Sequence, residues 1–267
     1  MPSPATLKAD SPETRHAYRL QGIVPNGIVI VASDAHYWPG PPSLMHRALV
    51  RTCKEYKPKI VILNGDVIDA PTVSRHARIG WETLPRLADE IEAAKDRVFE
   101  IEKASGRARK IWNLGNHDAR FESRLANVAP EYARIHGVHL NDHFPLWECA
   151  WSTWVNNEVV VKHRFKGGIY APRNNTLNAG KTMVTGHLHS AKVMPFDDYN
   201  GTRYGVDTGC IADTFGSQFV DYTEDSPRDW RSGFCVLTFK DGKLMNPELV
   251  TRWDEERVQF RGWVGKP

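Results

Sequence analysis

The stretch Gly27-Ile-Val-Ile-Val-Ala-Ser-Asp-Ala-His36 joins a short apolar run to a carboxylate and an imidazole. The run is rich in β-branched residues, which is typical of a strand buried on both faces. Asp34 and His36 follow at the point where this strand should end. Lys59-Ile-Val-Ile-Leu-Asn64 is a second run of the same kind, and Asp66 follows it closely. We therefore expect parallel strands that carry polar side chains at one edge of a sheet.

The segments around these two runs alternate between helix and strand patterns. Residues 43–56 can form an amphipathic helix, and residues 82–104 place their apolar side chains at helical spacing. Another apolar run, residues 109–114, follows the second helix. The first half of the chain is therefore predicted to have the order strand, helix, strand, helix, strand.

The second half is rich in strand patterns. The expected strands are 151–155, 158–163, 182–185, 203–207 and 233–240, with a hairpin turn at Asp241-Gly242 that leads into 244–253. The two halves together predict an α/β fold in which two mixed sheets pack face to face and flanking helices cover the outer sides. This architecture is a four-layer α-β-β-α sandwich.

The composition is that of an ordinary globular protein. The chain has 267 residues, of which 41% are hydrophobic, and this length can bury a complete core. We expect residues 1–25 to form a flexible arm, because Pro2, Pro4, Pro12 and several charges precede the first apolar run. Residues 26–267 should form a single domain. The net charge of +3, from 35 basic and 32 acidic residues, is too balanced to indicate nucleic-acid binding by itself.

Membrane and redox signals point to a cytoplasmic protein. No apolar run reaches the roughly 18 to 20 residues of a membrane span, and the start lacks the apolar core of a signal peptide. The four cysteines form no CxxC pair, which argues against a zinc cluster and against a disulfide framework. We expect a soluble, cytoplasmic chain without a membrane partner, whose oligomeric state the sequence does not indicate.

Side chains of metal-ligand type stand at the ends of several predicted strands. Asp66 follows its strand as Asp34 follows the first, and a carboxylate there can bridge two cations. Asn116 lies beside His117, which cannot easily reach the same ion, so these two residues should have different roles. Two later histidines, at 187 and 189, are spaced to point the same way on extended backbone. The candidate metal ligands are Asp34, His36, Asp66, Asn116, His163, His187 and His189.

Taken singly, each residue has an ordinary explanation, and a lone histidine is more often a hydrogen-bonded core or surface residue. The joint occurrence of the set, with each motif at the end of a separate predicted strand, indicates a metal site. The motifs resemble those of the calcineurin-like metallophosphoesterase superfamily. They are Asp34-x-His36, Gly65-Asp66-x-x-Asp69, Gly115-Asn116-His117-Asp118, His163 and Gly186-His187-x-His189. The resemblance spans residues 34–189, and no motif is missing.

The resemblance implies a dinuclear metal centre. One ion would be bound by Asp34, His36, Asp66 and His189, and the other by Asp66, Asn116, His163 and His187. We expect two divalent ions, with Mn²⁺ favoured by the resemblance and Zn²⁺, Fe or Ni²⁺ as alternatives that suit the same ligands. Two such ions lower the pKa of a bridging water, so that hydroxide can attack phosphorus in line.

The resemblance also implies catalytic roles for His117 and Asp69. His117 would contact the substrate phosphate or protonate the leaving group. Asp69 would hold the imidazole ring and raise its pKa toward the cationic form that a general acid needs. Asp69 could instead be the N-cap of a helix that begins near Pro71.

Departures from one branch of the superfamily favour another. Protein Ser/Thr phosphatases usually carry an arginine after the second motif and another before the third, where this chain has Ala70-Pro71 and Leu114. Asp118 is more similar to the phosphodiesterase and nuclease branches. We therefore expect a phosphodiesterase that acts on a nucleic acid or nucleotide-type substrate. The alternatives are a phosphomonoesterase for small molecules and a non-catalytic scaffold of the same fold.

Cationic side chains near the motifs are candidates for substrate binding. Arg75, His76 and Arg120 lie close in sequence to the second and third motifs, with Arg78 and Arg124 nearby. Each could approach phosphate oxygens, and each could equally be a solvated surface charge.

Overall fold

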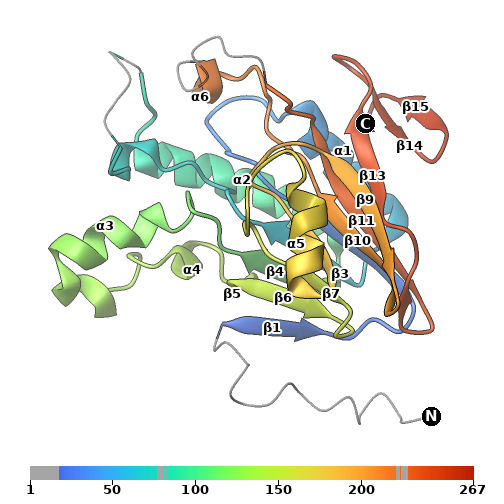
Figure 1. Cartoon of the computed structure of the whole chain (residues 1–267). Coiled ribbons are helices and arrows are strands. Elements are labelled where there is room, and N and C mark those ends of the chain that lie inside the picture. The colour runs from blue at the N-terminus through green and yellow to red at the C-terminus, as the bar shows by residue number, and fades with distance from the viewer. Residues whose placement is uncertain (1–17, 77–80, 82, 221–222, 224–227) are drawn as a thin grey trace.

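Two sheets form the centre of the protein, and helices lie outside them (Figure 1). The computed structural model describes residues 18–76, 81, 83–220, 223 and 228–267. Their helices are α1 (Leu44–Tyr56), α2 (Leu87–Ser105), α3 (Arg120–Val128), α4 (Leu140–His143), α5 (Ala171–Ala179) and α6 (Ser217–Val220), with 3₁₀-helices at Pro71–Val73 and Pro130–Arg134. Within this part of the chain, we find no helix whose length and apolar character would let it cross a membrane.

The larger sheet is built on the apolar runs of the first half. Its order is β15-β14-β13-β11-β2-β3-β4-β5, and β12 pairs with β11. Strands β2 to β5 are parallel, so the residues that follow β2, β3 and β4 emerge at one edge. Its strands are β2 (Gly27–Ala32), β3 (Ile60–Asn64), β4 (Arg109–Asn113), β5 (Glu148–Ala150), β11 (Gly233–Lys240), β12 (Lys243–Leu244), β13 (Glu248–Arg252), β14 (Val258–Phe260) and β15 (Trp263–Gly265).

The smaller sheet contains strands of the second half and one strand from the start of the chain. Its order is β1-β6-β7-β8-β10-β9, with parallel and antiparallel neighbours. The strands are β1 (Arg19–Gly22), β6 (Ser152–Val155), β7 (Val159–Val161), β8 (Thr182–Thr185), β9 (Lys192–Asp198) and β10 (Gly201–Asp207). The prediction of two mixed sheets is confirmed.

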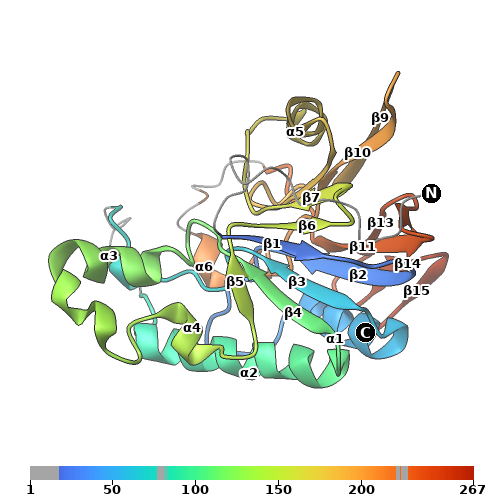
Figure 2. The ribbon, with the colours of Figure 1, turned by 90° about the horizontal axis from the view of Figure 1, so that it is seen from below.

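The sheets pack face to face between two helical layers, as Figure 2 shows. Val29 and Val31 of β2 belong to the core between the sheets, together with Val161 and Val184 of the smaller sheet. Ile30 points the other way and packs in the core under α1 and α2. Helix α5 covers the outer face of the smaller sheet at β8, β9 and β10. The four-layer α-β-β-α sandwich is therefore confirmed.

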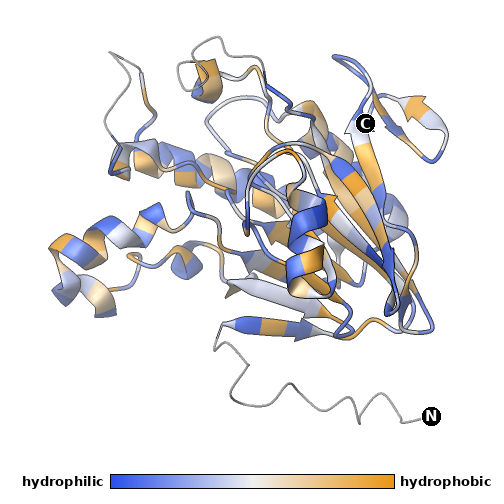
Figure 3. Ribbon diagram, viewed as in Figure 1, coloured by the Kyte–Doolittle hydropathy of each residue, from blue (hydrophilic) through white to orange (hydrophobic). Residues whose placement is uncertain are grey.

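Burial on both faces explains why the central strands have no alternating pattern. Apolar residues fill the central strands almost without interruption, whereas α2 alternates apolar and polar positions (Figure 3). The apolar side of α2 faces the larger sheet, and its charged side faces solvent. The sequence patterns predicted both environments correctly. A strand that is buried on both faces is apolar at every position, whereas a helix that is buried on one side is apolar only at helical spacing.

The boundary predicted at residue 25 for a flexible arm is wrong. Residues 19–22 form β1, which pairs in parallel with β6 from Arg19↔Ser152 to Gly22↔Val155. Leu20 packs on the core between the sheets, and the guanidinium of Arg19 lies 4.2 Å from the ring centroid of Trp154. A four-residue edge strand with polar residues carries too weak a pattern to predict a strand. Residues 1–17 of the expected arm lie outside the described residues.

Two other element boundaries differ from those expected. Helix α2 begins at Leu87 rather than at residue 82, which lies outside the described residues. Arg86 has extended backbone, and Pro85 disfavours a helical residue before it. The strand expected at 151–155 begins one residue later, at Ser152, and pairs with β1 and β7 in the smaller sheet. The residues before Trp151 form β5, which pairs with β4 in the larger sheet. The chain therefore passes from one sheet to the other at Trp151.

The hairpin predicted at Asp241-Gly242 is confirmed. Both residues have positive φ, 51° and 79°, and the flanking residues Lys240 and Lys243 are paired. The strand expected after the turn is divided into β12 and β13. The C-terminal hairpin of β14 and β15 docks on α1, where Arg51 lies 4.2 Å from the ring centroid of Trp263.

Candidate metal centre

The loops that follow β2, β3 and β8 meet at one edge of the two sheets. The backbone N–H groups of Asp34 and His36 donate to the carbonyl oxygens of Gly65 (2.9 Å) and Asp66 (3.0 Å). The loop after β8 reaches the same place, since the N–H of His187 donates to Oδ2 of Asp34 at 2.9 Å. Predicted ligands that are far apart in the sequence are therefore adjacent in the structure.

One group of ligand-type side chains consists of Asp34, His36 and His189. All three are buried, and one potential ligand atom from each lies within 4.8 Å of the others. Nε2 of His189 is 3.2 Å from Oδ1 of Asp34. Burial raises the pKa of Asp34, but the charges of His189 and His163 outweigh it and lower the pKa overall. This carboxylate is therefore ionised, as a metal ligand must be.

A second group consists of Asp66, His163 and His187, again with ligand atoms within 4.8 Å. Nδ1–H of His163 donates to the carbonyl of Asn64 at 2.8 Å, so that Nε2 points to Oδ2 of Asp66, 3.0 Å away. Burial lowers the pKa of His163, but the Asp66 and Asp34 carboxylates outweigh it and raise the pKa to about 9. A metal ion at Nε2 would have to displace that proton.

Unpartnered buried atoms test whether metal ions fit this site. Within the described residues, Nε2 of His36 and Oδ1 of Asn116 are buried without a hydrogen-bond partner. A buried polar atom without a partner costs about 1–3 kcal/mol. Since both atoms are metal-ligand types from predicted ligands, the donor set fits divalent ions that would supply the missing partners.

Five of the seven predicted ligands have left-handed backbone. Their φ values are 56° for Asp34, 41° for His36, 51° for Asp66, 72° for His187 and 56° for His189. A non-glycine residue in this region costs on the order of 1–3 kcal/mol and persists only where its surroundings hold it. The strand-end turns therefore aim these side chains inward at the expense of backbone strain.

Three motif glycines leave room for ligand side chains. A Cβ atom at Gly115 would lie 2.9 Å from Cγ of Asp66, and one at Gly65 would lie 2.6 Å from Cβ of His163. A Cβ atom at Gly186 would lie 2.5 Å from Oδ2 of Asp34. All three separations are too short for real Cβ contacts. Each glycine is therefore required by a ligand that belongs to a different motif.

His117 and His36 share the carboxylate of Asp69. Nδ1 of His117 is hydrogen-bonded to Oδ1 of Asp69, and Nδ1 of His36 lies 3.3 Å from the same oxygen. Burial raises the pKa of Asp69, but these hydrogen bonds outweigh it and hold the pKa well below its usual range. Nε2 of His117 faces Nη2 of Arg120 at 3.2 Å. Ala70, rather than Asp69, is the N-cap of the 3₁₀-helix that begins at Pro71.

Glu90 supports this group and was not among the predicted residues. It is fully buried, and its Oε1 accepts the backbone N–H groups of Asp69 (2.5 Å) and Ala70 (2.7 Å). Burial raises the pKa of Glu90 to about 7, although these N–H groups oppose the shift. The available signal was a carboxylate on the apolar face of a helix, between Leu87 and Ala94.

Asp118 joins two of the ligand-bearing loops. Its buried carboxylate accepts the N–H of Asp66, Val67, Ile68 and Gly115 and Nε1–H of Trp112, at distances of 2.8–3.2 Å. The last residue of the third motif therefore positions the second motif. From its sequence position alone, Asp118 distinguished only between branches of the superfamily.

Aromatic rings close one side of the first group. Phe219 lies edge-on to His36, with ring centroids 5.2 Å apart, and Trp230 lies 4.4 Å from His189. Phe219 and Trp230 also contact each other, at 5.0 Å. Phe219 had no predicted role, and its ring contacts place it in the wall of the site.

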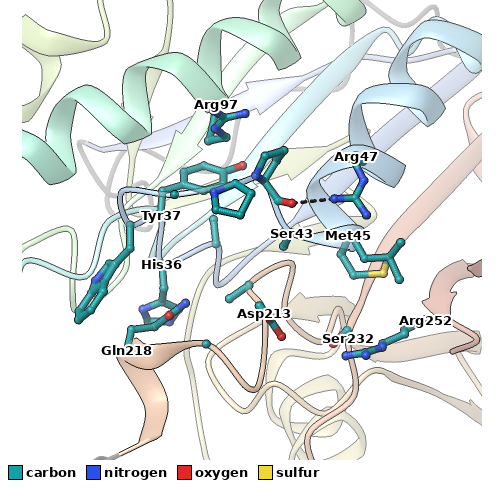
Figure 4. A pocket seen from close by; sticks show the side chains of 18 of the residues that line it. His36, Tyr37, Ser43, Met45, Arg47, Arg97, Asp213, Gln218, Ser232 and Arg252 are labelled. Atoms are coloured by element: carbon teal, nitrogen blue, oxygen red, sulfur yellow. Dashed lines mark hydrogen bonds between the residues drawn. The ribbon is translucent and has the colours of Figure 1, made fainter. Parts of the chain in front are cut away.

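Three cavities border the candidate ligands. The largest, about 740 Å³, adjoins Asn116 and His163, and the smallest, about 260 Å³, adjoins His187. A third, of about 370 Å³, adjoins His36, and Figure 4 shows it with Gln218 among its lining residues. Open space therefore adjoins the candidate ligands at three places.

The three predicted substrate-binding residues line the largest cavity. Arg75, His76 and Arg120 surround it, and Arg124 lies there too. Among them, Arg120 reaches Asp69, because its Nη1 is 3.7 Å from Oδ1 of that residue. Arg78 lies outside the described residues.

Fold and site together define the class of protein, which is a metal-dependent phosphoester hydrolase. The chain belongs to the calcineurin-like phosphoesterase family, whose model matches residues 28–203. This match confirms the resemblance that the motifs suggested.

Solved structures with a similar fold are distant in sequence. A single-substitution variant of Vps29 from Entamoeba histolytica is 15% identical with a TM-score of 0.46, over 87% of this chain and 96% of that chain. A protein serine/threonine phosphatase from Saccharomyces cerevisiae, with similarity to human phosphatase PP5, is 13% identical with a TM-score of 0.42, over 87% and 83%. No curated protein matches the chain.

Proposed function

We propose that this protein is a phosphodiesterase that uses two divalent metal ions and acts on a nucleic acid or nucleotide-type diester. The observation that carries the proposal is the pair of groups Asp34–His36–His189 and Asp66–His163–His187, each with ligand atoms within 4.8 Å of one another. Burying clusters of ionised carboxylates and imidazoles destabilises the fold unless a bound cation compensates the carboxylate charge.

The ligand assignment follows the two groups. One ion would be held by Asp34, His36 and His189, the other by Asn116, His163 and His187, and Asp66 would bridge them. Mixed oxygen and imidazole donors suit Mn²⁺, which we propose as the native ion. When bound, two such ions supply Lewis acidity that neutralises phosphate oxygens and lowers the pKa of water.

His117 and Asp69 would handle the proton of the leaving group. Asp69 orients the ring by accepting from Nδ1–H, which leaves Nε2 facing the site. Arg120 donates to Nε2 at 3.2 Å. A phosphate oxygen that accepts this N–H from Arg120 would free Nε2 to take up a proton from solvent, and the imidazolium would then give that proton to the departing oxygen.

Space around the site favours a diester over a monoester. A diester carries two organic groups on phosphorus, and both need room on leaving the metal centre. The cavities beside Asn116 and beside His187 offer about 740 and 260 Å³. A monoesterase needs only one such cavity.

The test is hydrolysis of bis(p-nitrophenyl) phosphate and p-nitrophenyl phosphate by EDTA-treated protein, with Mn²⁺, Zn²⁺, Ni²⁺ or Mg²⁺ restored. We expect Mn²⁺-dependent turnover with a preference for the diester and two bound ions by elemental analysis. His117→Ala should keep both ions and lose about 10²–10⁴-fold in rate. His136→Ala, at an exposed histidine paired with Asp142, is the matched control.

Each result decides between the candidate functions. A strong preference for the monoester would replace the proposal with a phosphomonoesterase. No bound metal and no turnover with any ion would instead favour a non-catalytic scaffold. Full activity in the His117→Ala variant would refute the role of that imidazole.

A further inference from the structure

The cavity beside Asn116 and His163 is strongly cationic. Its lining among the described residues includes no carboxylate. It does include six Arg and Lys side chains, which come from β1, the loop after β3, α3 and the end of β7. They are Arg19, Arg75, Arg120, Arg124, Lys162 and Arg164.

Most of these cations lack an acidic partner. Arg120 lies 3.7 Å from Oδ1 of Asp69, but the described part of the chain places no carboxylate within ion-pair distance of Arg75, Arg124, Lys162 or Arg164. Uncompensated positive charge inside a concave surface attracts anions strongly. The cavity is therefore suited to a ligand that brings several negative charges.

The cavity carries more positive charge than is required to neutralise one phosphate group. A diester phosphate carries one negative charge, whereas six cations line this cavity of about 740 Å³. Arg164 also lines the adjoining cavity near His187, which contains Lys166 as well. The cationic surface thus continues past the metal ligands from one cavity to the next. A chain of phosphates matches it better than a compact anion does.

An aromatic ring completes the cavity. Trp151 lines it and is 43% exposed. Its backbone is fixed at the crossing between the sheets, where its N–H donates to the carbonyl of Tyr18 at 2.9 Å. An exposed ring among cations is the arrangement that binds unpaired bases by stacking. Bases in a duplex are stacked on each other and do not offer their faces.

We propose that this cavity binds a single-stranded nucleic acid, with the arginines on its phosphates and Trp151 on a base, next to the phosphate that is cleaved. This inference rests on the proposed function, because it assigns the substrate of the same site. DNA and RNA share the chemistry that the cavity recognises.

The test is binding without catalysis. Fluorescence anisotropy in EDTA would measure the affinity for fluorescein-labelled oligothymidylate and oligouridylate of about 12 nucleotides, between about 50 and 200 mM salt. Arg124→Ala combined with Arg164→Ala should weaken binding and reduce the salt slope by about 1.4, since each neutralised single-strand phosphate contributes about 0.7. Trp151→Ala should weaken binding about tenfold with the slope unchanged, and Trp151→Phe should restore it.

The control is Lys54→Ala combined with Arg107→Ala, which removes two cations outside the cavity and should leave both affinity and slope unchanged. Wild-type affinity in the double-arginine variant, or equally tight binding of a duplex, would overturn the inference. A preference between the two oligonucleotides would decide whether DNA or RNA is the ligand. Turnover of bis(p-nitrophenyl) phosphate by the wild-type protein tests the proposed function separately, so either idea can fail alone.

Discussion

Replacing Gly115 by alanine should disable the site through a single added methyl group. Gly115 does not have left-handed backbone, so alanine is conformationally allowed and the effect is steric. The new Cβ would lie 2.9 Å from Cγ of Asp66, whereas non-bonded carbons pack at about 3.5–4.0 Å. Asp66 would therefore have to retreat by at least roughly 0.6–1.1 Å. Its Oδ1 and backbone N lie still closer to the new Cβ, so the main chain would have to move as well.

Asp66 cannot retreat without breaking other contacts. Its N–H donates to Asp118 at 2.9 Å, and its Oδ1 accepts the N–H of His117 at 2.8 Å. We expect a loss of about 1–3 kcal/mol in the free energy of unfolding. Because a misplacement of 1 Å can cost about 10²-fold in rate, kcat for bis(p-nitrophenyl) phosphate should fall by about that factor.

The assay compares kcat, bound metal and thermal unfolding in Gly115→Ala and in Gly167→Ala. Gly167 is the matched control, because a Cβ atom there meets nothing within 4 Å. A Gly115→Ala variant that binds two ions and turns over within about twofold of wild type would refute the reasoning. Asp66 would then not be the shared, rigidly held ligand.

Three further predictions concern charge and pH. Asp66→Asn should lose nearly all turnover and at least one metal ion per chain by elemental analysis, because an amide bridges two cations poorly; retained activity would exclude a bridging role. In EDTA-treated protein, pairing of His163 with carboxylates should stabilise the fold fully below pH 6.5 and lose this contribution as pH rises through about 9. Urea unfolding of wild type and His163→Gln should therefore differ more at about pH 6 than at about pH 10, and a constant difference would contradict this. Glu90→Gln keeps the acceptor for the N–H groups of Asp69 and Ala70 and removes a carboxyl group whose pKa burial raises to about 7, so this variant should have a higher Tm than wild type above that pH. Glu90→Ala removes the acceptor and should lower the free energy of unfolding by about 2 kcal/mol. Equal Tm values for the two variants would contradict the role of the acceptor.

The sheets and the positions of the candidate ligands could be predicted because both depend on residues that are adjacent in the sequence. A run such as residues 27–32 has no alternation because both of its faces are buried, and Asp34 must follow it where the strand ends. The pattern could not predict β1, because Arg19 and Gln21 give this edge strand a polar character. Its pairing depends on β6, which is far away in the chain.

Local sequence patterns also could not predict the residues that support the candidate ligands from behind. Glu90 supports Asp69 from a helix, and Asp118 holds the backbone at Asp66 from the next motif. The sequence shows only that Glu90 lies on the apolar face of a helix, because both roles arise from where the loops meet. The same holds for the cationic cavity, where Arg19 and Arg164 come together only after the smaller sheet has formed.

The left-handed backbone at five predicted ligands affects how the sequence of this protein can evolve. Glycine adopts such φ values at little cost, whereas each histidine there is strained and each aspartate somewhat less so. Substitution of a ligand such as His187 by glycine would therefore relieve strain in the fold while removing the chemistry. Selection of variants for thermal stability alone should therefore enrich such substitutions first. In this chain, substitutions that abolish activity at these positions would increase the stability of the fold.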